Sequence, residues 1–407
     1  MTKNKLKKAL ALALLSTAFG ALGQTSPIRP AYGYPSGPAE SGPASVQLGS
    51  APLYVTPYVG IGAGRDDNVL LAHTNEKTST VYFVSPGLKI DSRGPGFVFQ
   101  TRLQAQAARY SESRDDDYVD FLAGNQLDLA LSRRSFLRLG FDYIRSHDPR
   151  GSTDRAVSSR PDKYRLISPN ATYAFGAPGA EGRVELYWSD GYKAYTNNRA
   201  TTFLSDRDTR DVGAAFYWRV MPKTYVLLDV RDTDVHYRAS TSLLSSEERR
   251  YYAGVTWEAT AATTGTFKVG RLQKDFDSGR RSFSGGGWEG SVTWSPRTYS
   301  SFDFYTARTT NESTGLGDFI LSDIYGVSWN HAWNSVLSTN VNLRRQRDEY
   351  QGFNRTDEST TLGFKVGYKF RRWLTLGAEY THTNRDSNQN FFEYDKNLYL
   401  LTATASM

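Results

Sequence analysis

Apolar and polar residues alternate with a period of two through most of the chain from Leu53 onward. The segments Phe97–Ala107, Val212–Val220 and Leu362–Phe370 show this alternation most clearly. Successive side chains of a strand point to opposite faces, so this period predicts strands. A helix would instead place the charged residues of these segments on its apolar stripe. We therefore expect an all-β chain built of long strands.

Turn signals divide this strand pattern into hairpins. Tight turns are predicted at Arg93–Gly96, Arg133–Arg134, Gly176–Gly179, Met221–Lys223, Thr263–Gly265, Pro296–Arg297, Trp333–Asn334 and Arg371–Arg372. Between them lie longer polar stretches, at Ser111–Asp117, Ser146–Pro161, Tyr195–Asp208 and Arg345–Asp357. Short connections on one side and long ones on the other are typical of outer-membrane barrels, whose short turns face the periplasm.

The count of turns and loops predicts a transmembrane antiparallel β-barrel of about 18 strands, and 16 to 18 fit the pattern. Eight short turns, nine long loops and two periplasmic termini follow from that count. Many segments exceed ten residues, the length that a tilted strand needs to cross a bilayer. The C-terminal Leu400–Met407 has blurred alternation and lacks the terminal aromatic residue common in such barrels, so it leaves the register of the last strand open.

The two faces of these strands have the chemistry of lipid on one side and water on the other. Outward positions carry Val, Leu, Phe and Ala. Aromatic residues stand near the strand ends, where girdles occur: Trp188, Trp218, Trp257, Trp294, Trp329, Tyr368 and Tyr380. The candidate pore-lining residues are Arg102, Asp128, Arg138, Asp142, Arg183, Glu185, Tyr187, Tyr217, Arg219, Asp229, Arg231, Glu289, Asp303, Arg344, Lys365 and Glu379. A barrel of this size is too wide for side chains alone to fill, so we expect a wet lumen.

The mixed charges of this lumen allow two interpretations. A ring of one sign would indicate ion selectivity, whereas mixed charges with interspersed tyrosines suit a hydrated, hydroxyl-rich solute such as a sugar. The same residues could equally form a wall of paired charges that keeps the barrel rigid. The residues alone leave both open.

The N-terminus has the three parts of an export signal. Lys3, Lys5, Lys7 and Lys8 precede the apolar run Ala9–Leu15, and small residues follow at positions 21–23. This pattern predicts a cleaved signal peptide over residues 1–23. Residues 24–52 are rich in Pro and Gly, which predicts an extended periplasmic tail. The barrel should then occupy residues 53–407.

Composition narrows the class further. The 407 residues include 26 Tyr, 21 Phe and 8 Trp, which argues against wholesale disorder, and there is no Cys to form disulfides or thiolate metal sites. The formal net charge of +7 falls to +3 without residues 1–23, because four lysines leave with them. That balance predicts no anionic partner, and nothing indicates nucleic acid.

Catalytic chemistry has few candidates. The five histidines, His73, His147, His236, His331 and His382, are far apart in the sequence. His236, near Asp232 and Asp234, is the best candidate for an enzymatic site at the rim, but no nucleophile accompanies it. The acidic runs Asp115–Asp117 and Asp206–Asp211 lack the glycine spacing of a calcium loop, and we interpret them as solvated loop segments. We therefore expect no enzyme activity, no cofactor and no metal site.

The start of the predicted barrel carries a resemblance. Pro57-Tyr58-Val59-Gly60, Arg65-Asp66-Asp67-Asn68-Val69 and Ser85-Pro86-Gly87-Leu88 occur in an order that resembles the Putative beta-barrel porin 2 family, which includes EpsL-type barrels of exopolysaccharide operons. The clear match covers about 35 residues. It implies an outer-membrane channel paired with polysaccharide synthesis and export.

The expected function is a passive conduit for an exopolysaccharide or capsular polysaccharide in the outer membrane of a Gram-negative bacterium. A long loop such as Ser146–Pro161, folded inward, could gate it. The expected partners are outer-membrane lipid and lipopolysaccharide, a periplasmic polysaccharide export protein and the polymer itself. The alternatives are a general diffusion porin for small hydrophilic solutes, an enzyme with a site at the barrel rim, and an adhesin.

Overall fold

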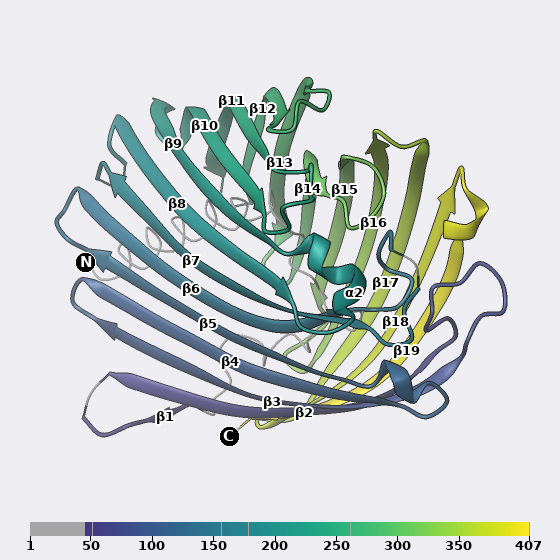
Figure 1. The fold of residues 1–407 in the computed structure, drawn as a ribbon. Coiled ribbons are helices and arrows are strands. Elements are labelled where there is room, and N and C mark those ends of the chain that lie inside the picture. Colours follow the sequence, from purple (N-terminus) through teal and green to yellow (C-terminus); the bar gives the residue numbers. More distant parts are fainter. Residues whose placement is uncertain (1–44, 51, 156, 178, 261, 407) are drawn as a thin grey trace.

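The chain forms a closed antiparallel barrel of 18 strands, which confirms the predicted fold class and strand number (Figure 1). In the computed structural model the described residues are 45–406, except 51, 156, 178 and 261. The strands of the barrel are β2 (Leu53–Asp66), β3 (Ser79–Gly94), β4 (Phe97–Tyr110), β5 (Tyr118–Ala130), β6 (Ser135–Asp148), β7 (Asp162–Phe175), β8 (Gly182–Tyr195), β9 (Arg207–Met221), β10 (Thr224–Tyr237), β11 (Ser246–Thr260), β12 (Thr263–Phe276), β13 (Phe283–Arg297), β14 (Ser300–Glu312), β15 (Phe319–Ala332), β16 (Leu337–Gln351), β17 (Arg355–Arg371), β18 (Leu374–Ser387) and β19 (Tyr394–Ser406).

Pairing of the last strand with the first closes the barrel. β19 runs antiparallel to β2, from Leu398 opposite Asp66 to Ser406 opposite Tyr58. This pairing fixes the register that the blurred C-terminal alternation left open. This closure joins the two terminal strands of the barrel, as a bilayer requires because lipid cannot hydrogen-bond an unpaired strand.

Short connections at one end of the barrel alternate with mostly longer ones at the other end. The short turns lie at the end where β2 begins and β19 ends, which is the periplasmic end in outer-membrane barrels. The longest loops join β2 to β3, β6 to β7 and β8 to β9 at the other end. Four short helices lie in the long loops, η1 (Arg114–Asp116), α2 (Arg199–Thr202), η2 (Phe203–Ser205) and η3 (Asn390–Phe392). Among the described residues, no helix is long and apolar enough to cross a membrane.

The predicted loop Arg345–Asp357 is wrong. β16 continues to Gln351 and β17 begins at Arg355, so only residues 352–354 connect them. The charges in this segment pair across and along the strands, Arg345 with Glu358 at 2.6 Å and Arg347 with Glu349 at 2.9 Å. Charged residues therefore do not mark the ends of these strands. The hairpin continues beyond its apolar segment because its charged side chains are paired with one another.

Two predicted turns are displaced by a few residues. Thr263–Gly265 belongs to β12, and Pro296–Arg297 ends β13. In both hairpins the register shifts beside the connection, and the strands then pair up to its last residue, as Arg297 does with Ser300. This shift of register allows backbone pairing between the two strands to continue up to the turn, so residues predicted as turn belong to the strands.

The tail prediction needs one correction. Val46–Gln47 form β1, which pairs with Val55 and Tyr54 of β2, so part of residues 24–52 is a short strand. The predicted signal peptide and residues 24–44 lie outside the described residues.

The outer face of the wall carries an exposed apolar band. Val212, Phe216 and Trp218 of β9 alternate with inward residues and are each at least 40% exposed to solvent in the isolated chain. Two apolar clusters pack inside the barrel beneath the long loops. One contains Val69, Val81, Phe83, Ala108, Tyr110, Tyr118, Leu398 and Leu400, and the other Leu272, Phe276, Phe319 and Leu321.

Candidate transport path and its extracellular closure

A cavity of about 2050 Å³ lies inside the barrel, lined from the end of β3 round to β14. It extends from the short turns, at Arg93, Arg133 and Lys223, to the long-loop end, at Thr310 and Glu312. Ten of the sixteen candidate pore residues line it: Asp128, Arg138, Asp142, Arg183, Glu185, Tyr187, Tyr217, Asp229, Arg231 and Glu289. Ser, Thr and Asn side chains of β7, β9, β12 and β13 complete its polar wall.

The other six candidates lie on the same face of the wall. Their partners are wall residues: Arg102 donates to Gln104, Arg219 to the carbonyl of Gly179, and Arg344 to Gln346. Asp303 accepts from Thr293 and Asn330, and Lys365 lies 3.7 Å from Glu379. Contact of the sixteen with a permeating solute stays a prediction.

Most lumen charges are compensated by neighbours in the wall. Lys268 Nζ lies 2.8 Å from Asp229 and 2.6 Å from Glu289, and Arg231 lies 3.0 Å from the same Asp229. Arg250 joins this group through Glu289, at 3.8 Å, and also pairs with Glu248, at 2.7 Å. Hydrogen-bonded ions in such a network hold one another in place, and each cancels much of its partner's field. The wall of the lumen is therefore polar but carries little net charge.

The lumen tyrosines lie along this wall. The Tyr187 ring covers Gly213 of the next strand, where an added Cβ would come within 2.3 Å of the ring, and its hydroxyl bonds Asp229. Tyr217 donates its hydroxyl proton to Glu185 at 3.1 Å. Because these residues also line the cavity, each ring combines a fixed polar end with an apolar surface beside the path.

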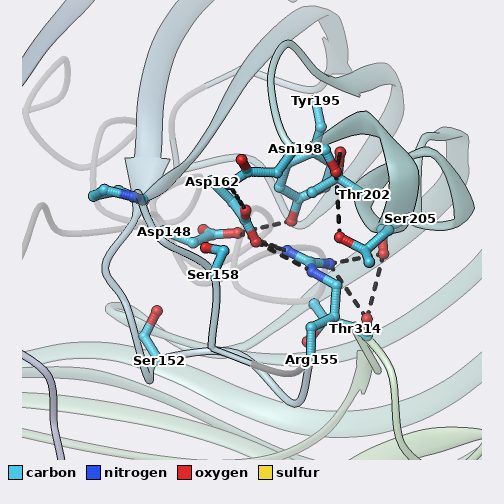
Figure 2. Close-up of polar contacts among 12 residues, drawn as sticks. Asp148, Ser152, Arg155, Ser158, Asp162, Tyr195, Asn198, Thr202, Ser205 and Thr314 are labelled. Atoms are coloured by element: carbon cyan, nitrogen blue, oxygen red, sulfur yellow. Dashed lines mark hydrogen bonds and ion pairs between the residues drawn. The ribbon is translucent and has the colours of Figure 1, made fainter. Parts of the chain in front are cut away.

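The loop between β6 and β7 crosses the long-loop end of the barrel. Figure 2 shows Arg155 of this loop among polar groups from several segments. Its guanidinium donates to Asp162 at 2.7 Å and to Ser205 Oγ at 2.9 Å, and it reaches the carbonyl of Thr314 at 3.3 Å. Burial alone would lower the pKa of Arg155, but its interactions with Tyr195 and Asp162 raise it, so this cation stays charged.

Asp154 carries the same loop to the opposite wall. It accepts hydrogen bonds from Tyr350 at the end of β16, at 2.8 Å, and from Arg355 at the start of β17, at 3.0 Å. Its backbone N–H donates to Thr314 Oγ1. The predicted inward fold of the loop after β6 is confirmed by these contacts, and gating by this loop stays a proposal.

The hairpin of β14 and β15 also leans into the lumen at this end. The ladder between β13 and β14 ends at the pair Trp288 and Arg308, so Phe283–Gly287 pair with β12 alone among the described strands. The freed end of β14 reaches inward instead, where Glu312 accepts from Lys274 at 2.7 Å and from Tyr237 at 2.9 Å. Loop and hairpin tip together form what we call the extracellular closure, residues 149–161 and 309–318.

Sequence reasoning missed most of this closure. Asp154, Arg155 and Glu312 were not candidates, although charged residues inside a long loop and at a strand end were visible signals.

The structure also places the candidates for catalysis and metal binding. His236 is exposed and lies opposite Asp208 of β9, while Asp232 pairs with Arg249. Contrary to the expectation, the acidic run after β4 is not simply solvated, because Asp116 is buried and binds Arg150 of the loop after β6, and Asp117 accepts from the N–H of Tyr110 in β4. No group of three or more His, Cys, Asp or Glu that could hold a metal occurs in the described part of the chain.

Comparison with known families identifies the barrel. The model of the Putative beta-barrel porin 2 family matches residues 43–407, which is most of the chain. The chain belongs to the Putative beta-barrel porin 2 family. It is therefore an outer-membrane β-barrel porin of the Gram-negative type, as expected from the hairpin asymmetry. The resemblance seen at the first two barrel strands extends over the whole barrel.

Solved structures similar to this porin are outer-membrane proteins of low sequence identity. A BenF-like porin from Pseudomonas fluorescens is 10% identical, with 87% of this chain and 99% of that chain covered and a TM-score of 0.49. OccAB3 of Acinetobacter baumannii is also 10% identical, with 87% and 99% covered and a TM-score of 0.46. The FrpB iron transporter of Neisseria meningitidis is 12% identical, with 81% of this chain covered and a TM-score of 0.45, and this porin spans 62% of its length. None of the curated proteins matches this porin.

Proposed function

We propose that this porin is a passive conduit through which an exopolysaccharide or capsular polysaccharide leaves the cell. The observation that carries the proposal is the compensated, hydroxyl-rich wall of the cavity. Ser168, Asn170 and Thr172 of β7 face the cavity beside the tyrosines Tyr187 and Tyr217. Hydroxyl and amide groups can both donate to and accept from sugar hydroxyls, and aromatic rings cover the apolar faces of sugars.

The paired charges support a path along which a polymer can slide. A free charge would hold one solute group strongly, whereas Lys268, Arg231 and Asp229 are already engaged with one another. Conduction requires binding that is weak and distributed over many sites, so that the solute can leave each one. Membership of the Putative beta-barrel porin 2 family also supports the proposal, because the N-terminal barrel segments resemble the EpsL-type barrels of exopolysaccharide operons.

The extracellular closure favours a second candidate, a general diffusion porin for small hydrophilic solutes. Asp154 and Arg155 tie the loop after β6 to β17, to the β14–β15 loop and to Ser205, which narrows the mouth. A polymer could pass only after these contacts break, whereas small solutes need only gaps between them.

The deciding experiment is deletion of the gene in a bacterium that secretes the polymer. Polymer trapped in the periplasm or missing outside, restored by the intact gene, is the expected result. Normal secretion by the deletion strain contradicts the conduit. Liposome swelling separates the second candidate, which predicts rapid entry of mono- and disaccharides through the purified porin with its closure intact.

The expected partner is a periplasmic polysaccharide export protein. Such a protein would meet the eight short turns, because these face the periplasm. Crosslinking from a photoreactive residue placed at Ser335, in the turn between β15 and β16, tests this contact in polymer-producing cells. Crosslinked product restricted to self-adducts or lipid contradicts it.

A further inference from the structure

The charges of the periplasmic end are distributed differently from those of the rest of the barrel. We define the periplasmic rim as the eight short turns with their flanking strand ends, residues 93–97, 130–135, 175–183, 219–224, 258–264, 295–300, 332–337 and 369–374. The rim contains ten basic residues, Arg93, Arg133, Arg134, Arg183, Arg219, Lys223, Arg297, Lys369, Arg371 and Arg372, and two acidic ones, Glu181 and Glu258.

The opposite end shows no such excess. The nine long loops, between the strand bounds given above, contain nine basic and eleven acidic residues. The lumen between the two ends is built of paired ions. The net charge of +3 is the sum of a rim of +8 and a remainder of −5, so the total hides a strongly basic end of the barrel. The expectation of no anionic partner was based on that total and does not take the rim into account.

Most rim cations also lack a carboxylate partner, whereas most basic residues elsewhere in the described part of the chain have one. Of the ten, only Arg183 forms an ion pair among the described residues, with Glu185. Arg219 donates instead to the carbonyl of Gly179, and Arg371 lies over the Phe370 ring. An uncompensated charge keeps its full field, which extends about 8–10 Å into solution at physiological salt.

Part of the rim faces the lumen rather than lipid. Arg93, Arg133, Arg183 and Lys223 line the cavity at its periplasmic mouth, and they come from four different turns. Two carboxylates, Glu258 of the rim and Glu185, the ion-pair partner of Arg183, line the cavity near them, so cations predominate at this mouth without being alone. A mouth lined predominantly by one sign of charge concentrates ions of the opposite sign and raises their rate of entry. Cations that only anchored the barrel to lipid phosphates would stand on the outer face.

We propose that the periplasmic rim is an electrostatic capture site for an acidic polysaccharide, one whose repeating unit carries a carboxylate or another anionic group. Guanidinium groups suit such a ligand because they bind carboxylates in a bidentate fashion. The rim would draw the chain into the mouth, and the compensated lumen wall would then let it slide. This inference rests on the proposed conduit function and adds the chemical class of its substrate.

The test uses the full-length porin in planar bilayers, with polygalacturonate oligomers as the anionic probe and dextran of similar length as the neutral one. The rim variant is R133Q/R134Q/K223Q, which replaces three exposed cations. The matched control is K77Q/R114Q/R281Q, which removes the same charge from the long loops. Both are first checked for a heat-modifiable barrel, so that a variant that fails to fold is replaced by the single substitution K223Q.

We expect polygalacturonate on the periplasmic side to block the current at low salt, while dextran blocks weakly. The rim variant should raise the half-blocking concentration by at least about tenfold, and the control variant should leave it unchanged. The difference should vanish near 1 M salt, where the screening length is about 3 Å. Equal block by the two polymers, or equal half-blocking concentrations for the rim and control variants, overturns the proposal.

Two further outcomes separate this inference from its alternatives. If the rim variant changes only barrel stability in anionic lipid and not the block, the cations bind lipid phosphates and the proposal is wrong. If the deletion strain secretes polymer normally while the anionic block persists, the conduit function fails and the anion-capturing rim stands.

Discussion

The carboxylate of Asp154 meets the guanidinium of Arg355 at 3.0 Å, although the two residues are 201 positions apart in the sequence. Asp154 lies in the loop after β6, and Arg355 begins β17. Both side chains are at least nine-tenths buried, and Arg355 also binds Asp357. The contact ties a loop from one wall of the barrel to a strand of the other, and it is the ion pair by which this loop is held to β17.

Replacing Asp154 with Asn should loosen the extracellular closure. The variant keeps the size of the side chain but removes the negative charge opposite Arg355, and breaking a buried ion pair costs about 3–5 kcal/mol. Asp357 still compensates Arg355, so we expect the lower part of that range. Single-channel recordings should show longer and more frequent openings. The control is Asp115→Asn, because Asp115 is 64% exposed and lies 3.8 Å from Arg160. Equal open times for the two variants contradict a role of the Asp154 contact in closure.

Gly151 offers a test of the same loop that changes no charge. Its φ of +77° is in the left-handed region, and a Cβ there would lie 2.1 Å from the carbonyl oxygen of Leu70. Gly151→Ala should therefore displace the loop from the β2–β3 loop and increase open probability.

Gly279 provides the matched control for Gly151. It has nearly the same φ, +75°, but nothing lies within 4 Å of the added Cβ. Gly279→Ala should cost only the strain of the left-handed backbone, about 1–2 kcal/mol. If both alanine variants alter gating alike, backbone strain rather than contact with Leu70 explains the effect.

The inward lean of the β14–β15 hairpin should depend on the pair of Lys274 and Glu312. Lys274 is fully buried and Glu312 is 12% exposed, so either partner left alone is an uncompensated charge. Glu312→Gln or Lys274→Met should each lower the free energy of unfolding by about 3–5 kcal/mol. The double variant should lose clearly less than the sum, since it removes both charges.

Urea unfolding of the porin in lipid vesicles measures this cycle. The comparison pair is Arg345 and Glu358, which are 67% and 40% exposed and should couple by less than about 1 kcal/mol. Additive losses at Lys274 and Glu312 would show that the hairpin tip is held by its apolar contacts with Leu272 and Phe276 instead.

The barrel could be predicted from the sequence, but the contacts of the extracellular closure could not, and the reason is physical. Strand number and lumen face follow from local alternation, as in Phe97–Ala107, because each side chain's direction is fixed by its immediate neighbours. Asp154 and Arg355, or Lys274 and Glu312, meet through loop paths and an interrupted ladder that no local pattern records. The basic rim was readable from the turns, but only once their common end was established could residues such as Arg133 and Lys223 be grouped.

Lys268 distinguishes a structural wall of charges from a conducting one. Its Nζ bridges Asp229 and Glu289 and is 8% exposed, so Lys268→Met leaves two close carboxylates with one cation fewer. We expect a loss of about 3 kcal/mol in unfolding free energy, together with a shift of the reversal potential toward cation selectivity. Lys365→Met makes the same change of charge at a looser pair, where Lys365 is 35% exposed and 3.7 Å from Glu379. It should shift selectivity similarly at a cost of less than about 1 kcal/mol. A selectivity shift in neither variant would mean that permeant ions do not sense the wall, whereas equal stability losses would mean that the network around Lys268 adds nothing to rigidity.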